Sequence, residues 1–493
     1  MYRNTFKHTL TSILIQTFLF CLITTSVDAQ SNTILQTKID KNVSQGDFKT
    51  ANISLAVVDL ESGKLIGEHR ANKLLTPASS LKLFTTFTAL ETLGENFQFE
   101  TSISYRGSID KEGTLKGDII IVGGGDPTLG TTKLKGTLSF NELINDIVKK
   151  IKAAGINCID GTVIADESIY DSYPVAPTWQ WNDLGNYYAS GAWSININEN
   201  LYYIYFNKRD IIGAKPNIQS IFPKVYKLKL SNELTVDSAH TGDNAYIFGG
   251  PYNYDKRIVG TIPQGKGLFT IKGSIPDPPS FFAHAIFSKL NKQKIKSEGY
   301  KTVYKSERGL RKKIATYRSP TLDKIVKKAN FESNNLYTES MLKMIGLKER
   351  GLGSGQNGIA VINKILRKSG IKPKELMIRD GSGLSARNNI SSYSMAQFLY
   401  QMSKSIDVET LNNYLPRGGY SGTVSGMFVK SKAKGNVWLK SGSMEGVQSY
   451  SGFIRAKSGK WVSFSIIVNG FTTKGSIIRA KLDKLIRDIY TAC

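Results

Sequence analysis

The stretch Thr76-Pro77-Ala78-Ser79-Ser80-Leu81-Lys82 decides how the rest of this sequence is interpreted. Threonine is a favoured N-cap and proline is favoured at the first helical position, so the stretch predicts the start of a helix. Apolar residues cover most sides of the following segment as far as Leu93, and Gly94 provides a stop. A helix that is apolar nearly all round belongs in a protein core.

Two polar residues lie at the start of this apolar helix. Ser79 and Lys82 are three residues apart, so a helix places them on the same face. A lysine in a core needs partners, and burial lowers its pKa. We therefore expect Ser79 to act as a nucleophile and Lys82 as the base that accepts its proton.

Two further motifs strengthen this interpretation. Ser333-Asn334-Asn335 is an S-x-N at the start of a predicted helix, and Lys440-Ser441-Gly442 is a K-[ST]-G at the end of a predicted strand. The set S-x-x-K, S-D-N and K-T-G marks penicillin-binding proteins and class A β-lactamases. S-x-x-K alone arises by chance in many proteins. All three motifs in this order, each in the expected local structure, indicate a real site.

The N-terminus predicts export. Arg3 and Lys7 precede an apolar run from about Leu10 to Ile23, and small residues lead up to Ala29. Residues 1–29 therefore form an expected secretory signal peptide, cleaved near Ala29, and the mature chain is expected in the periplasm. A membrane anchor is the less favoured alternative, because the run is short and interrupted by polar residues.

Composition narrows the class of function. The chain has 493 residues, 40% of them apolar and 21% charged, as in a globular protein of two or three domains. Its net charge of +25 is dispersed along an exported chain without a nucleic-acid motif, which favours an anionic cell wall or membrane surface over nucleic acid. His69, His240 and His284 lack metal-ligand spacing, so neither a metal nor a cofactor is expected. The pairing of Cys158 and Cys493 is left open.

The order of elements predicts one domain split by an insertion. A strand at residues 53–60 and its hairpin partner at 65–69 precede the apolar helix, and helices followed by a strand-rich end return after residue 276. Short strands fill the middle, among them one expected at residues 225–230. We expect an α+β domain formed by residues 30–97 and 277–493, and a β-rich accessory region of two small lobes at 98–276.

Two features of this middle region have a plain interpretation. The turn Gly123-Gly124-Gly125-Asp126 matches neither G-x-G-x-x-G nor a P-loop, so it predicts a tight turn and not a nucleotide site. An aromatic cluster could bind sugar, but we favour core packing of a small lobe for it. Its members are Trp179, Trp181, Tyr187, Tyr188 and Trp193.

Over essentially the whole mature chain, the sequence resembles class C low-molecular-mass penicillin-binding proteins of the D-alanyl-D-alanine carboxypeptidase/endopeptidase type. Besides the three motifs, four stretches carry the resemblance: Pro77-Ala78-Ser79, the stretch from Gly117-Asp118 to Gly125-Asp126-Pro127-Thr128-Leu129, Asp380-Gly381-Ser382-Gly383-Leu384-Ser385, and Gly422-Thr423. It implies a penicillin-binding-protein/β-lactamase-like transpeptidase domain, an antiparallel sheet flanked by helices, with the long β-rich insertion. Ser441 stands where threonine is usual, and Asn334 where aspartate is usual.

The resemblance also implies a role for each motif residue. Lys82 takes the proton of Ser79, its pKa lowered by burial and by Lys440. Backbone N–H groups of Ser79 and Ser443 hold the oxyanion. Ser333 relays a proton to the leaving amine, and Asn335 forms a hydrogen bond to the substrate backbone. The K-[ST]-G strand, with Lys440, Ser441 and Gly442, binds the terminal carboxylate.

The expected activity is therefore that of a serine D-Ala-D-Ala carboxypeptidase that trims peptidoglycan stem peptides through an acyl-enzyme on Ser79 and is inhibited by β-lactams. Whether it also cleaves cross-links as an endopeptidase is left open, as are contacts with a membrane surface or a second copy. Two alternatives remain: a β-lactamase or esterase on the same fold, and a non-catalytic wall-binding protein. A Ser-His-Asp triad is disfavoured because no G-x-S-x-G elbow occurs.

Overall fold

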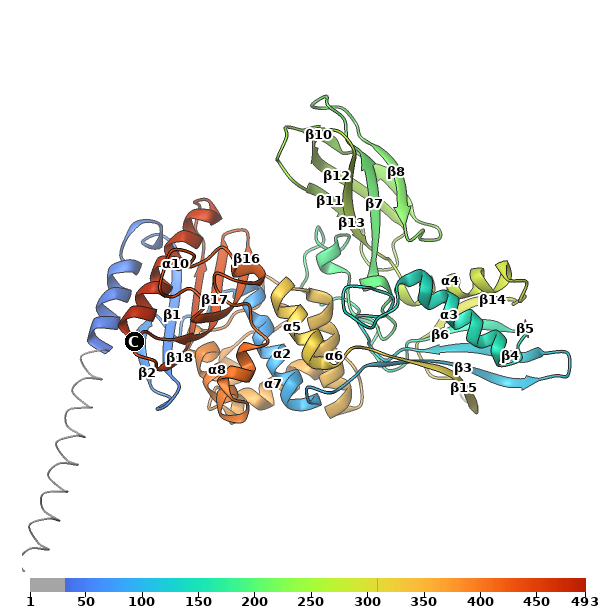
Figure 1. The fold of residues 1–493 in the computed structure, drawn as a ribbon, viewed down its shortest axis with the longest axis horizontal. Helices are drawn as coiled ribbons and strands as arrows, with labels where there is room; N and C mark the ends of the chain where they lie inside the picture. The colour runs from blue at the N-terminus through green and yellow to red at the C-terminus, as the bar shows by residue number, and fades with distance from the viewer. Residues whose placement is uncertain (1–31, 308) are drawn as a thin grey trace, which may run out of the picture. The chain divides into compact units, whose positions relative to one another are not determined.

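The computed structural model describes residues 32–307 and 309–493 and divides them into two compact units (Figure 1). Unit 1 contains the described residues up to Ser80, together with Ser369–Leu376 and Asn389–Cys493. Unit 2 contains Leu81–Lys368 and Met377–Asn388. The predicted signal peptide at 1–29 lies outside the described residues. Within them, no helix combines the length and the apolar character that crossing a membrane requires.

Unit 1 is built on a five-stranded antiparallel sheet with the order β16-β17-β18-β1-β2. The strands are β1 (Asn52–Asp59), β2 (Leu65–His69), β16 (Val437–Met444), β17 (Val447–Arg455) and β18 (Trp461–Asn469). The predicted hairpin of β1 and β2 is confirmed.

Helices cover both faces of this sheet (Figure 1). Helix α10 (Gly475–Ala492) contacts β17, and α8 (Ser392–Ser405) contacts β1 and β18. Successive side chains of a strand point to opposite faces. Accordingly Ile53, Leu55 and Val57 of β1 join the core that contains α10, whereas Ala56 and Val58 pack with Ala396 of α8. This arrangement explains why β1 is apolar at nearly every position.

The rest of unit 1 is short helical structure. Residues 32–43 are helical, and Leu35 and Ile39 add to the core beside α10. The other elements are η1 (Gly46–Phe48), η2 (Ala78–Leu81), η5 (Pro373–Glu375), α9 (Val408–Asn412) and η6 (Gly422–Val424).

Unit 2 contains a group of helices around α2 (Lys82–Leu93). Helices α5 (Leu322–Glu332), α6 (Asn335–Arg350) and α7 (Gly355–Lys368) all contact α2. The residues from Lys82 to Leu90 are all buried, which confirms the predicted core helix. Gly94 ends it as predicted, with a φ of 83° and its N–H bonded to the Leu90 carbonyl.

The predicted start of this helix is wrong by one turn. Residues Ala78–Leu81 form the 3₁₀ turn η2, and the α-helix proper begins at Lys82. Ala78 has a φ of 48°, in the left-handed region, so the chain cannot enter an α-helix directly from Pro77. The cap and proline signals therefore identified a helical segment but misplaced its first α-helical residue.

A six-stranded sheet with the order β14-β6-β4-β3-β15, with β5 paired to β4, forms a second part of unit 2. Its strands are β3 (Glu100–Ile109), β4 (Thr114–Val122), β5 (Cys158–Asp160), β6 (Thr162–Asp166), β14 (Gly299–Val303) and β15 (Arg311–Arg318). Helix α4 (Pro278–Lys292) packs on β6 and β14, and α3 (Phe140–Ala153) packs on β15 and α4.

Helix α3 lies in the middle region, where only short strands were expected, so it was not predicted from the sequence. Its start carries a capping box, in which the Ser139 hydroxyl accepts from the Glu142 N–H and the Glu142 carboxylate accepts from the Ser139 N–H. Five buried apolar residues, among them Ile147 and Ile151, face the core of the unit.

Two smaller sheets complete unit 2. One has the order β13-β7-β8, from β7 (Leu201–Asn207), β8 (Asn217–Phe222) and β13 (Leu268–Ser274). The other joins β9 (Lys229–Asn232), β10 (Thr235–Asp237), β11 (Asn244–Phe248) and β12 (Asp255–Pro263). The 3₁₀ turns η3 (Tyr187–Ala189) and η4 (Asn198–Asn200) precede β7. The predicted strand at 225–230 is wrong for residues 225–228, which form a loop. The proposed domain boundaries at 97/98 and 276/277 stay predictions.

Candidate active site

Ser79 lies in η2, in unit 1. It is partly exposed, whereas its neighbour Ser80 is buried and donates a hydrogen bond from its hydroxyl to the Pro77 carbonyl at 2.9 Å. Ser449 of β17 donates to the same carbonyl at 2.5 Å and to the Ser80 hydroxyl at 3.0 Å. These bonds fix the turn to the sheet of unit 1. The accessible hydroxyl of the two adjacent serines is that of Ser79.

Gly442 allows this turn to approach β16 closely. A Cβ at this position would lie 2.5 Å from the Pro77 carbonyl oxygen and 2.8 Å from the Ser79 nitrogen. Both distances are shorter than a van der Waals contact, so any larger residue would push η2 away from the strand. The glycine of the K-[ST]-G motif therefore sets the distance between the backbone of Ser79 and the motif strand.

The other motif residues of β16 follow in register. Lys440 is fully buried, and its ammonium donates to the Ser441 carbonyl at 2.7 Å. The Ser441 hydroxyl is 2.7 Å from the Thr423 hydroxyl of η6. Ser443 is exposed on the same strand. Unit 1 thus gathers Ser79 and the K-[ST]-G strand, which the sequence separates by some 360 positions.

Lys82 is the first residue of α2, in unit 2, and is fully buried. Its ammonium donates to the Asn335 side-chain oxygen and to the Ser382 carbonyl, both at 2.6 Å. Burial lowers the pKa of Lys82 to about 7, against the opposing effect of the Asp380 and Glu339 carboxylates. Burial therefore acts as expected, and the predicted contribution of Lys440 stays a prediction.

Ser333 and Asn335 lie at the junction of α5 and α6. Ser333 ends α5 with a φ of 57°, in the left-handed region that is unfavourable for serine. Asn334 caps α6, its side-chain oxygen accepting from the Tyr337 N–H at 3.1 Å. Asn335 begins α6 and donates from its amide nitrogen to the Tyr188 carbonyl at 2.8 Å. Both polar ends of Asn335 are therefore used, one of them by Lys82.

The loop at 380–385 holds the second partner of Lys82, the Ser382 carbonyl. The sequence alone assigned no role to this loop. The buried Asp380 carboxylate accepts from the N–H groups of Gly383 at 2.8 Å and Ser385 at 2.6 Å. It also accepts from the Trp179 indole and from the Asn388 amide, each at 2.8 Å. These four bonds fix the loop and thereby the Ser382 carbonyl.

Glu339 supports the same loop and was missed from the sequence. It lies on α6 one turn after Asn335, is buried, and accepts from the N–H groups of Gly381 at 3.0 Å and Ser382 at 2.7 Å. Burial, and to a smaller extent the charge of Asp380, raise the pKa of Glu339 to about 7. Its spacing of four from Asn335 placed it on the same helix face, which is the signal that could have identified it.

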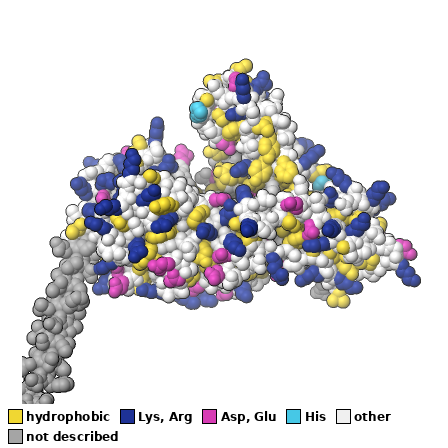
Figure 2. All heavy atoms as spheres, in the orientation of Figure 1, with side chains coloured by type: hydrophobic (Ala, Val, Ile, Leu, Met, Phe, Trp, Pro, Cys, Tyr) yellow, Lys and Arg dark blue, Asp and Glu magenta, His cyan; other side chains and the backbone are white. Residues whose placement is uncertain are grey.

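The aromatic cluster is partly core, as predicted. Trp179 and Trp193 are buried. Trp181 and Tyr187 contradict the expectation, because they are 68% and 50% exposed. The Trp181 ring centroid lies 4.7 Å from that of Phe248. Lys and Arg side chains are scattered over the visible face and do not gather in one patch (Figure 2). Among the described residues, no group of His, Cys, Asp and Glu could hold a metal ion, and Cys158 and Cys493 are both free thiols.

The fold and the three motifs define the class as that of the penicillin-binding-protein/β-lactamase-like serine enzymes. Comparison with known proteins defines the family. Residues 35–488 match the model of the D-Ala-D-Ala carboxypeptidase 3 (S13) family, and the chain belongs to that family. It is a serine peptidase of the D-Ala-D-Ala carboxypeptidase type.

Curated relatives match this chain over most of their own length. D-alanyl-D-alanine carboxypeptidase DacB of Haemophilus influenzae is 26% identical over 449 residues, covering 89% of this chain and 90% of the relative. D-alanyl-D-alanine carboxypeptidase of an Actinomadura species is 25% identical over 465 residues, covering 89% and 81%. The crystal structure of penicillin-binding protein 4 (dacB) from Haemophilus influenzae matches with a TM-score of 0.77 at 25% identity, covering 89% of this chain and 96% of that one.

Proposed function

We propose that this enzyme removes the terminal D-alanine from peptidoglycan stem peptides that end in D-Ala-D-Ala, through an acyl-enzyme on Ser79. The observation that carries the proposal is Lys82, a fully buried lysine with a pKa near 7 that lies three residues after an accessible serine. A lysine with this pKa has a substantial neutral fraction near pH 7 and can accept a hydroxyl proton.

In the proposed acylation, the Ser79 oxygen attacks the carbonyl carbon of the penultimate D-alanine, and its proton passes to Lys82. The negative oxygen of the tetrahedral intermediate is held by the N–H groups of Ser79 and Ser443. The C–N bond then breaks, and a proton delivered through Ser333 allows D-alanine to leave as an amine. Water next attacks the ester, which releases the shortened peptide and restores Ser79.

Substrate binding is assigned to the remaining motif residues. Lys440 and Ser441 hold the terminal carboxylate, and Gly442 keeps the strand against the turn that carries Ser79. Asn335 pairs with the substrate backbone while its oxygen holds Lys82. Serine at 441 and asparagine at 334 keep the hydroxyl and the helix cap that these positions supply.

Three finer statements belong to this proposal. The enzyme is exported to the periplasm after cleavage near Ala29. It is acylated by β-lactams, and the Haemophilus influenzae relative has been solved in complex with one. As an endopeptidase, it also hydrolyses the D-Ala cross-links that join two stem peptides, provided that the cross-linked donor peptide reaches Ser79.

The test is D-alanine release from a synthetic D-Ala-D-Ala-terminated peptide, with muropeptides analysed in parallel by mass spectrometry. The parent is expected to release D-alanine, and Ser79→Ala to release none. Ser80→Ala is the matched control, because its hydroxyl is buried in the turn, and it is expected to stay active.

Each alternative has its own signature in this experiment. Equal D-alanine release by the parent and Ser79→Ala would refute the proposal. Sacculus binding without D-alanine release would indicate a non-catalytic wall-binding protein. A penicillin adduct that hydrolyses within seconds, without peptide hydrolysis, would indicate a β-lactamase.

A further inference from the structure

A cavity in unit 2 combines aromatic rings with a small set of polar groups. Its volume is about 250 Å³, and it lies between the 223–228 loop, the start of α4 and strand β14. Its walls include Tyr226, Tyr254, Asp277, His284 and Tyr300, and we call it the Tyr226 pocket. None of these residues belongs to the three catalytic motifs.

The aromatic rings of the Tyr226 pocket are ordered against one another. Tyr226 stacks on His284 with ring centroids 4.4 Å apart and 16° between the planes. Tyr300 meets the same imidazole edge-on, at 5.0 Å and 69°. Tyr226 is 49% exposed, although a ring of this size is usually buried further when it serves only the core. The pocket therefore presents a stacked, half-exposed aromatic ring, with the Lys227 ammonium 5.4 Å from its centroid.

The pocket is lined by one cationic side chain, Lys227, and one carboxyl group, Asp277, and this balance favours a neutral ligand over an ion. Asp277 caps α4, its Oδ1 accepting from the Ser280 N–H at 3.0 Å, and its Oδ2 makes no hydrogen bond to a residue that the structure describes. The first two residues of α4 are Pro278 and Pro279, which have no N–H, so this helix start offers an anion little. Burial and the charge of Lys227 lower the pKa of His284, which favours the neutral form of its ring.

A sugar ring matches this combination of groups. One face of a pyranose presents C–H groups that pack on an aromatic ring, and its equatorial hydroxyls bond carboxylate and phenol oxygens. The volume suits a single ring, whereas a protein partner would need a contact area of about 800 Å² per side. We propose that the Tyr226 pocket binds a sugar of a glycan strand.

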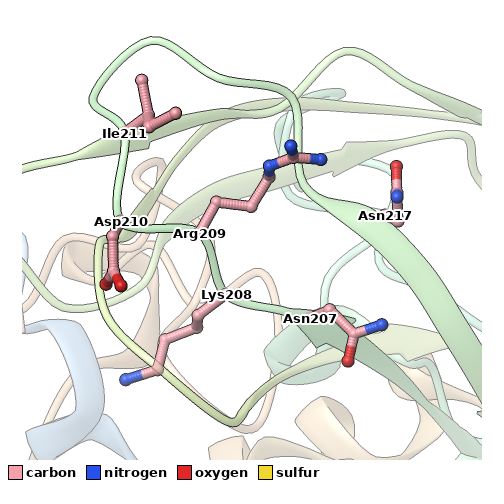
Figure 3. Close-up of a pocket in the computed structure, with 6 residues that line it drawn as sticks. All are labelled: Asn207, Lys208, Arg209, Asp210, Ile211 and Asn217. Carbon is pink, nitrogen blue, oxygen red and sulfur yellow. The ribbon is translucent and has the colours of Figure 1, made fainter.

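A second hollow in unit 2, at the β7–β8 loop, does not have these properties. It is lined by residues such as Lys208, Arg209 and Ile211, whose side chains point apart (Figure 3). Ile211 is 66% exposed and no ring lines the hollow. Surface lysines and arginines without a converging geometry do not specify a ligand, so the Tyr226 pocket carries the inference alone.

The identity of the glycan as that of the cell wall rests on the proposed function. The peptide substrate is attached to such strands, so a sugar site on the enzyme would raise the concentration of stem peptides around it. The pocket itself stands on its own geometry. Glycan binding and peptide hydrolysis are therefore measured separately, and either can fail without the other.

The test uses two probes: triacetylchitotriose in isothermal titration, and peptide-free glycan strands, prepared with an amidase, in co-sedimentation. We expect both to bind the parent, and Tyr226→Ala to weaken binding about tenfold through loss of the stacking ring. Asp277→Asn preserves the helix cap and is expected to weaken binding about fivefold. Tyr173→Ala removes an exposed tyrosine outside the pocket and is expected to bind as the parent does.

Hydrolysis of a free D-Ala-D-Ala peptide is the folding control, and it is expected to be unchanged in Tyr226→Ala. Absence of binding to both probes would overturn the proposal. So would equal affinity in the parent and Tyr226→Ala, or binding of a peptide or protein at the pocket in place of the glycan.

Discussion

Lys82 and Lys256 are both buried in unit 2, and their surroundings differ in an instructive way. Lys82 and Lys256 are 0% and 2% exposed, and burial lowers their pKa values to about 7 and about 8. Lys256, on β12, donates to the carbonyls of Gly249 and Gly250 and ties a turn to its strand. Lys82 donates to one carbonyl and to the side chain of Asn335, and it follows an accessible serine by three residues.

The comparison shows that a lowered lysine pKa does not identify a base. Desolvation alone produces it at both positions. What distinguishes Lys82 is its sequence neighbour Ser79 and the acidic pair Glu339 and Asp380, whose carboxylates oppose the effect of burial. Burial is the cause of the lowered pKa of Lys256, and its two hydrogen bonds both go to backbone carbonyls of a turn. The predictions below test this difference.

The largest effect is expected from removing the two ammonium groups. Lys82→Met should lower kcat/KM for a D-Ala-D-Ala peptide by about 10³-fold, because the Ser79 hydroxyl loses its base. Lys256→Met should leave kcat/KM within about twofold, since it removes only a structural bond. Comparable losses in both variants, with both folded by circular dichroism, would remove the distinction between the two lysines.

The next effect concerns Asn335, whose side chain bonds Lys82 and has no counterpart beside Lys256 among the bonds described above. Asn335→Asp places a carboxylate at the oxygen that lies 2.6 Å from the ammonium. An opposite charge at this distance raises a lysine pKa by about two units, so kcat/KM near neutral pH should fall about 100-fold and recover toward higher pH. The measurement is the pH profile of kcat/KM. If kcat/KM of Asn335→Asp falls on the acid side at the same pH as that of the parent, the role of Lys82 as base is contradicted.

A smaller effect is expected from Glu339, whose pKa is about 7. As this carboxyl ionises with rising pH, it favours the protonated form of Lys82. Glu339→Gln should therefore reach its activity plateau at a lower pH than the parent. Its maximum should fall less than about tenfold, because the amide oxygen still accepts from Gly381 and Ser382. Glu349→Gln, on the exposed end of the same helix, is the control, and a shift shared by both variants would argue against a specific effect.

Replacing Lys256 should change the stability of the protein and not its activity. Its folded pKa, near 8, lies below the unfolded value of about 10.4, so between these pH values the unfolded chain binds more protons. The free energy of unfolding should therefore rise with pH across this window in the parent and rise less in Lys256→Met. Urea unfolding at several pH values measures this. Identical slopes would show that the Lys256 pKa is not lowered.

The smallest effect is expected from the cap that begins α6. Asn334→Asp restores the aspartate that is usual in the motif, and its carboxylate can still accept from the Tyr337 N–H. A negative charge at a helix N-terminus stabilises by about 0.3–1 kcal/mol, so Tm should rise slightly. Activity should stay within about twofold. A large change in kcat would show that Asn334 acts in the chemistry and not as a cap.

The sequence predicted the parts of the fold that depend on local patterns. The β1–β2 hairpin, the core helix and its Gly94 stop follow from periodicity and end signals that act within a few residues. The left-handed Ala78 was not predictable, because η2 is held by Ser449, which is distant in the chain. Helix α3 was missed although Ser139 and Glu142 form a capping box.

The candidate site divides in the same way. Ser79, Lys82, Ser333 and Lys440 were identifiable because a motif is a local spacing with known chemistry. Glu339 and Asp380 were not assigned, because their importance lies in the bonds that fix the Ser382 carbonyl. The Glu339 bonds join residues about 40 positions apart in the chain. The steric need for Gly442 against the Ser79 turn likewise appears only in three dimensions.

The most direct test of the central claim is the rate at which a labelled penicillin acylates Ser79 as a function of pH, with the adduct located by peptide mass spectrometry. The account predicts an adduct on Ser79 and a rate that rises to half its maximum near pH 7, where Lys82 loses its proton. An adduct on another residue, or a rate that does not change across pH 7, would contradict it.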